Sequence, residues 1–224
     1  MPRTPFIRKK NYNGITDKTV KKLQLGASAV FKNFDPATDT YASAKTAGKC
    51  LGATRGGVQI RIENTVEQIP VDGAGGRMKG LGQITEIAAS AALSLIEVSE
   101  ETLALALGAA VVDSTSQDVP TGYDKITGTY ELAEEDFIEN ITIIGCISGE
   151  DTPIIFQLLN CFNEDGLTLQ TGDSESGVLP VTVYAYNDVD EAMEDDLVPP
   201  YNIFYPKASN SSNNNGGGST PSTP

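Results

Sequence analysis

The chain of 224 residues contains no histidine and no tryptophan. Histidine is the commonest general base and the commonest metal ligand, so its absence removes the usual catalytic triad and weakens any enzymatic hypothesis. Only three cysteines are present, Cys50, Cys146 and Cys161, and their spacing matches neither a zinc site nor a disulfide framework. Cys146 and Cys161 lie in apolar runs, which predicts that both are small core residues. Free thiols of this kind fit assembly in a reducing cytoplasm.

Long apolar runs are also missing. No segment approaches the length needed to span a bilayer, and the first ten residues, MPRTPFIRKK, lack the apolar centre of a signal peptide. We therefore expect no membrane binding by the monomer and no export through the Sec pathway.

Positive charge is scarce in the second half of the chain. Residues 101–224 contain two basic residues, Lys125 and Lys207, and 21 acidic ones, whereas residues 1–50 contain ten basic and three acidic ones. An acidic surface holds DNA poorly, because phosphate binding depends on Lys and Arg, and DNA can slide past it. The opposed charges also favour head-to-tail self-association. Solubility alone is the other explanation of an acidic surface.

Among the patterns that are present, a long hairpin over residues 52–98 organises the chain. Val58, Ile60 and Ile62 alternate with polar residues in its first arm. In the second arm one face comprises Ile87, Ala89, Ala91, Leu93 and Leu95, and the other comprises Glu86, Ala88, Ser90, Ala92 and Ser94. A period of two with one apolar face predicts half-buried antiparallel strands. The glycine-rich connector, residues 71–80, is too long for a two-residue turn and predicts a projecting, functional loop.

The remaining patterns predict a mainly β chain with one short α-helix. Ser99 caps a helix that Gly108 ends, and Glu100 and Glu101 favour its N-terminus. Further strands are predicted within 21–34, 141–148, 153–161, 167–170 and 177–186. Residues 201–206 form an apolar patch that is predicted to dock on the domain or on a neighbour. Residues 40–50 remain unassigned, and 109–140 are interpreted as a crossing region. We divide the chain into a basic arm (1–20), a β domain (21–206) and a low-complexity tail (207–224).

Three segments resemble chemical sites superficially, and the sequence argues against each. Residues 134–136 are consecutive acids, which do not converge on one point in a strand or helix. Residues 187–190 begin like a calcium loop but lack its mid-loop glycine. Residues 73–76 lack the Gly-Lys-Ser/Thr ending of a phosphate loop. We therefore predict a protein that is not an enzyme and carries no catalytic residue, metal or cofactor.

Several short motifs occur in an order that is typical of one family. They are Leu23–Ala27 with Phe31, Leu51–Gly57, Asp72–Ala74 with Gly76, and Lys79-Gly80. Together they resemble the major tail tube protein of long-tailed, siphovirus-type phages of Gram-positive bacteria, over roughly residues 20–205. The resemblance implies a β-sandwich or barrel subunit with a flanking helix. It also implies stacked, hexameric rings around a lumen that conducts DNA from capsid to host. The acidic charge of the chain predicts that this lumen is anionic.

The resemblance assigns roles to particular residues. The connector would reach the adjacent ring, and the basic arm with Arg8, Lys9 and Lys10 would help lock subunits together. The connector residues are Asp72, Gly73, Ala74, Gly75, Gly76, Arg77, Met78, Lys79 and Gly80. The face with Glu86, Ser90 and Ser94 is a candidate for the lumen surface, and ordinary solvent exposure is the alternative explanation.

The resemblance also implies partners and a location. Beyond further copies of the chain, these are a tape measure protein, a tail terminator and a distal tail protein, with double-stranded DNA passing without specific binding. Assembly would take place in the bacterial host cytoplasm and the product would be part of the virion. The alternative function is a non-catalytic β-sandwich binding or adhesion module, or another virion structural protein.

Overall fold

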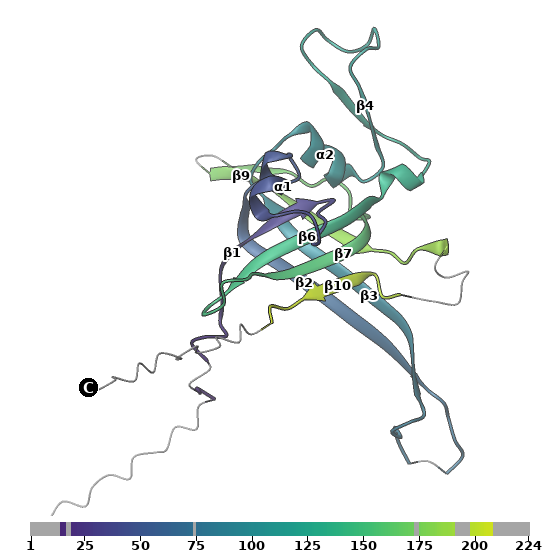
Figure 1. Cartoon of the computed structure of the whole chain (residues 1–224). Helices are drawn as coiled ribbons and strands as arrows, with labels where there is room; N and C mark the ends of the chain where they lie inside the picture. The colour runs from purple at the N-terminus through teal and green to yellow at the C-terminus, as the bar shows by residue number, and fades with distance from the viewer. Residues whose placement is uncertain (1–13, 17–18, 74, 173–174, 191–197, 208–224) are drawn as a thin grey trace, which may run out of the picture.

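Antiparallel strands are the main regular structure of the protein and far outweigh its helices, which confirms the predicted mainly β class. The computed structural model describes residues 14–16, 19–73, 75–172, 175–190 and 198–207 (Figure 1). Its strands are β1 (Gln24–Lys32), β2 (Thr54–Gln68), β3 (Gly82–Leu95), β4 (Ala110–Asp113), β5 (Lys125–Gly128), β6 (Ile138–Ile147), β7 (Ile154–Phe162), β8 (Gln170–Gly172), β9 (Glu175–Ala185) and β10 (Tyr201–Phe204). Its helices are α1 (Tyr41–Thr46), α2 (Glu100–Leu107) and the 3-10 turn η1 (Glu134–Asp136).

The main sheet has two halves that are joined by a short pairing between β7 and β9. Its strand order is β1-β6-β7-β9-β3-β2, with β10 beside β7 and β8 beside β9. Strands β7 and β9 pair only at Cys161↔Ala185 and Phe162↔Tyr184, whereas β10 takes the same edge of β7 further along. The short β7–β9 contact lets β1-β6-β7 and β9-β3-β2 face each other across a shared interior.

The hydrophobic core fills that interior. It contains Val30, Leu51, Ala89, Ala91, Leu93, Leu95, Leu105, Ala106, Ile141, Ile143, Leu158, Cys161, Leu179, Val181 and Val183. The predicted alternation of β3 is confirmed, because Ala89, Ala91, Leu93 and Leu95 are at most 3% exposed while Glu86 and Ala88 are exposed. Burying one such leucine or valine side chain stabilises the fold by about 1.5–3 kcal/mol, so this face fixes the register of the long hairpin.

Helix α2 begins and ends where the sequence predicts. The Ser99 hydroxyl accepts a hydrogen bond from the Thr102 amide at 3.2 Å, and the Thr102 hydroxyl accepts one from the Ser99 amide at 2.8 Å. This reciprocal cap satisfies two amides that a helix start leaves free. Gly108 follows the helix with φ of +78°, which only glycine adopts easily. Leu105 and Ala106 then cover one end of the core.

A second, smaller cluster lies on the outer face of β1 and β6, and the sequence analysis left its helix unassigned. Helix α1 packs Ala44 against Phe31, Phe34 and Ile144. Its start is capped by Thr40 and Ser43, whose side chains bond to each other's amides at 3.2 and 2.8 Å. Because α1 covers this face, β6 is buried on both sides from residue 141 to 145.

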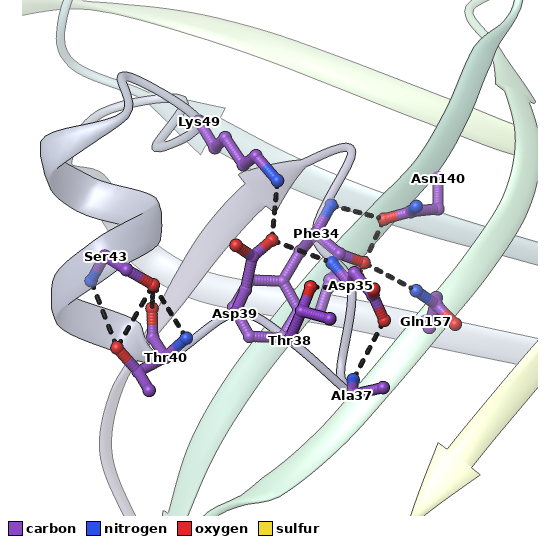
Figure 2. A network of polar contacts seen from close by, with 11 residues as sticks. Phe34, Asp35, Ala37, Thr38, Asp39, Thr40, Ser43, Lys49, Asn140 and Gln157 are labelled. Atoms are coloured by element: carbon purple, nitrogen blue, oxygen red, sulfur yellow. Dashed lines mark hydrogen bonds and ion pairs between the residues drawn. The ribbon is translucent and has the colours of Figure 1, made fainter.

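Polar contacts bind the chain that leads into α1 onto the sheet (Figure 2). The Phe34 amide donates to Asn140 Oδ1 at 3.0 Å, and Gln157 Nε2 donates to the Phe34 carbonyl at 2.9 Å. The Asp39 carboxylate accepts from the Asp35 amide at 3.0 Å and from Lys49 Nζ at 2.5 Å. These contacts, the amide first and the lysine second, lower the pKa of Asp39, so this link weakens as the pH falls below the carboxyl's ordinary range.

Replacing Gln157 by leucine should lower the free energy of unfolding by about 1–3 kcal/mol, because the buried Phe34 carbonyl loses its donor. Both residues are at most 6% exposed, so water cannot easily replace that donor. Urea unfolding followed by circular dichroism measures the effect. Gln59→Leu, on the exposed face of β2, is the matched control and should change stability by less than about 0.5 kcal/mol. Equal effects of the two substitutions would contradict the assigned hydrogen bond.

Two predictions from the sequence are wrong in detail. The strand predicted over 167–170 contains only Gln170, where β8 begins, and Leu167 and Leu169 are 40% and 44% exposed. Leu167 and Leu169 alternate with polar residues, but no described strand pairs with residues 167–169. Cys146 is exposed rather than a core residue, because the α1 cluster ends at Ile144 and leaves the outer face of β6 uncovered beyond it. Cys161 is buried in the main core, as predicted.

Candidate assembly surfaces

The predicted long hairpin is confirmed, and its outer part extends past the sheet as a free ribbon (Figure 1). Strand β9 pairs with β3 only from Ala89 to Leu95, so residues 64–68 and 82–87 pair with each other alone within the described chain. Val66 and Ile84 lie opposite each other and are 48% and 53% exposed. A bulge at Thr85 places Ile84 on the side of Val66. The apolar face of the hairpin therefore continues beyond the core without a cover.

The end of the ribbon, which we call the hairpin tip (residues 69–81), carries the predicted connector. The Ile69 amide donates to the Leu81 carbonyl at 2.9 Å, and Gly73 and Gly80 adopt φ of +82° and +96°. The loop folds around a hollow of 360 Å³. Exposed apolar side chains on it are Ile69, Val71 and Met78, beside exposed Asp72, Arg77 and Lys79. The predicted connector residues thus lie together at one projection, except Ala74, which is outside the described residues.

The predicted lumen residues Glu86, Ser90 and Ser94 lie on one face of β3, opposite the core. Ser90 stands between Arg61 of β2 and Tyr184 of β9, and Ala92 stands in the same way between Gln59 and Thr182. Small and hydroxyl side chains thus dominate this face.

The charges of Arg61, Glu63 and Glu86 on this face add up to −1, so the face is weakly negative. Arg61 forms an ion pair of 2.7 Å with Glu63, which leaves Glu86 as the remaining charge among these side chains. Partial burial and the nearby Asp165 carboxylate raise the pKa of Tyr184, so its hydroxyl stays uncharged near neutral pH. Arg61 is the one cation among these residues, and its pairing with Glu63 leaves it less available to a phosphate.

A second projection lies at the opposite end of the molecule, beside α2 (Figure 1). We call residues 110–132 the outer arm. It contains the separate two-stranded sheet β4–β5, in which Val111 and Val112 point to opposite faces and are 58% and 37% exposed. Tyr123 and Tyr130 are also exposed. The sequence predicted a crossing region here rather than a hairpin. The signal that could have identified the hairpin is the pair Val111-Val112, followed by a turn-rich stretch and then Ile126.

The acidic clusters form no metal site within the described chain. Residues 134–136 form η1, where the Asp136 carboxylate accepts from the Ala133 amide at 2.8 Å and so caps its own turn. Asp188 likewise accepts from the Asp190 amide at 2.9 Å. A hollow of 530 Å³ between these segments is lined by Phe137 and Tyr186 as well as by acids, of which Asp188 binds a local amide. The predicted contact residues Arg8, Lys9 and Lys10 lie outside the described residues.

The described ends of the chain meet on one side of the sheet. Lys22, before β1, forms an ion pair of 2.6 Å with Glu150 and donates to the Tyr205 hydroxyl at 3.1 Å, after β10. The hydrogen bond to Glu150 is the main reason that the pKa of Lys22 is raised. The segments before β1 and after β10 therefore lie side by side at Lys22 and Tyr205.

The thiols differ enough to be told apart by labelling. Burial raises the pKa of Cys161 to about 12, whereas Cys146 is exposed. Because the thiolate is the reactive form, we expect a thiol reagent at pH 8 to modify Cys146 in the folded protein and Cys161 only after unfolding. Mass spectrometry of labelled peptides measures this, and Cys146→Ser should remove the fast reaction. Fast labelling of Cys161 in folded protein would contradict the core placement.

Comparison with known proteins gives no relative: no protein-family model and no curated protein matches the chain. Within the described residues, no helix has the length and apolar character needed to cross a membrane.

Proposed function

We propose that the chain is the structural subunit of a phage tail tube, polymerising as stacked rings around a lumen that conducts DNA. In this proposal the β-sandwich or barrel is the tail-tube fold, the rings are hexameric, and the role is structural rather than catalytic. The partners are further copies of the chain, a tape measure protein, a tail terminator and a distal tail protein. The subunit would assemble in the host cytoplasm and act in the virion.

One observation supports the proposal most: the β2–β3 ribbon leaves the sheet with its apolar face bare. A monomer gains nothing from exposing Val66, Ile84 and the apolar tip residues to water, because each would be more stable in contact with other apolar groups. A second copy that covers the ribbon would remove this cost. Exposed apolar projections are therefore typical of subunits whose apolar surfaces become buried when the subunits assemble.

The sheet edge offers the second support. Strand β2 is 15 residues long and stands at the end of the strand order, so no strand among the described residues pairs with its outer edge. Soluble monomers usually shield such an edge, because it invites pairing with another chain. In a ring the same edge can pair with a neighbour, and the face with Ser90 and Ser94 would then form the inner surface.

That inner surface would conduct DNA by failing to bind it. Affinity for DNA comes mainly from Lys and Arg contacts to phosphates. The single arginine noted on this face is paired with Glu63, and the other side chains beside Ser90 are small or hydroxylated. DNA would slide along such a surface, with the acidic remainder of the chain adding a weak repulsion.

Electron microscopy of the purified chain tests the proposal. We expect rings or tubes with a central channel, either spontaneously or after addition of preformed tail tips as initiators. Size-exclusion chromatography at several salt concentrations provides the parallel solution measurement. A protein that remains monomeric at high concentration under all these conditions would support the alternative of a binding module.

A further inference from the structure

The two projections of the molecule have complementary surfaces and lie at opposite ends (Figure 1). The hairpin tip (69–81) is apolar and carries two basic residues and one acid, a net charge of +1. The outer arm (110–132) also exposes apolar side chains, and it carries four acids and one lysine, a net charge of −3. Surfaces that match in this way and face opposite directions can form a heterologous contact, which repeats from copy to copy.

The outer arm shows the stronger need for a partner. An isolated two-stranded sheet is at best marginally stable in water, because it cannot bury both of its faces. In β4–β5, Val111 on one face and Val112 on the other are both exposed, and the arm stands apart from the main sheet. Tyr123 and Tyr130 are 71% and fully exposed. A second surface must cover these groups if the arm is to be rigid.

The hairpin tip has the chemistry to cover them. Ile69, Val71 and Met78 supply apolar contacts, and methionine adapts its shape to irregular partners. Arg77 can stack on an exposed tyrosine ring, an arrangement that proteins use repeatedly. Lys79 can approach the acids of the arm.

We propose that the outer arm of one subunit is the docking site for the hairpin tip of the next subunit along the tube. This inference rests on the proposed function and adds to it the surface that receives the tip. The contact is heterologous and joins opposite ends of two copies, so it can extend a stack in one direction without closing on itself. It also gives the stack a polarity, because one end presents free arms and the other end presents free tips.

Charge reversal tests the contact. The double substitution Arg77→Glu with Lys79→Glu should reduce the yield of polymer by about tenfold or more, because like charges then face each other. Asp118→Lys with Asp124→Lys should have a similar effect. Both acids are exposed and accept no hydrogen bond among the described contacts, so each variant should fold normally, as circular dichroism and thermal unfolding would verify. The variant with all four substitutions should recover polymer to within about threefold of the original.

Cross-linking separates this inference from the proposed function. A photoreactive amino acid in place of Met78 should link, in the polymer, to a peptide from residues 110–132 of another copy. Polymer that forms normally but links elsewhere, or charge reversals that the combined variant does not rescue, would overturn the arm as docking site and leave the tube intact. A chain that forms no polymer at all would overturn both the tube and this contact.

Discussion

Deleting Gly73–Lys79 should abolish the formation of tubes while the subunit still folds. The deletion leaves Pro70-Val71-Asp72-Gly80 between Ile69 and Leu81, and a loop of four residues with Asp-Gly can close a hairpin. The Ile69–Leu81 backbone bond that defines the end of the ribbon can therefore still form. What is lost is the projection with Met78, Arg77 and the hollow around them. The measurement is electron microscopy of the polymer beside circular dichroism of the subunit.

A conservative variant provides the control for this deletion. Met78→Leu with Lys79→Arg keeps an apolar side chain and a positive charge at the same positions, so tubes should form as before. The stability of the deleted subunit should change by less than about 1 kcal/mol, since Gly73 and residues 75–79 are exposed and lie outside both core clusters. Tubes that assemble normally from the deleted chain would show that the tip has no role in stacking.

The long hairpin could be predicted from sequence because its information is local and periodic. Ala89, Ala91, Leu93 and Leu95 repeat every second residue, and that period defines a strand and its buried face together. The bulge at Thr85 could not be predicted, because strict alternation puts Ile84 on the same side as Glu86. Only the pairing with Val66 shows that the apolar face continues into the ribbon. The apolar face of the ribbon, on which the proposed assembly depends, thus arises from one bulge in the β2–β3 pairing.

Segments whose structure depends on distant neighbours were harder to predict. Helix α1 has six residues and a single buried side chain, Ala44, so its own sequence carries little periodicity. It forms because Phe31, Phe34 and Ile144 offer a surface for it. The same surface explains Cys146: an apolar run predicts burial, but the actual exposure depends on where α1 ends. The outer arm escaped prediction since its four-residue strands β4 and β5 are separated by a long turn.

Substituting Gly108 by alanine should destabilise the fold strongly, although the change adds a single methyl group. Gly108 combines φ of +78° with ψ of −112°, a conformation that residues with a side chain rarely adopt. A Cβ atom at this position would lie 2.6 Å from the Asn163 carbonyl oxygen and 2.9 Å from the Phe162 ring. The carbonyl belongs to the backbone and cannot rotate away. Strain and overlap together should lower the free energy of unfolding by about 2–5 kcal/mol.

The position of Gly108 explains why the cost spreads beyond the glycine itself. Asn163, at the end of β7, is 2% exposed and its Nδ2 donates to the Ala106 carbonyl at 2.7 Å. This bond satisfies the C-terminus of α2, which otherwise leaves carbonyls free. A methyl group that pushes Asn163 away would break the bond and lift α2 from the core that Leu105 and Ala106 cover. The outer arm follows α2 directly, so its orientation would change as well.

Gly122→Ala is the matched control for Gly108→Ala. Gly122 has φ of +86°, but no atom lies within 4 Å of the place that an alanine Cβ would take, so only backbone strain of about 1–2 kcal/mol is expected. Thermal and urea unfolding of the two variants measure the difference. A larger loss for Gly108→Ala shows that the close approach of α2 and β7, and not the left-handed backbone alone, requires glycine there. Equal losses would mean that Asn163 can move aside, and that the end of α2 is held less tightly than its contacts indicate.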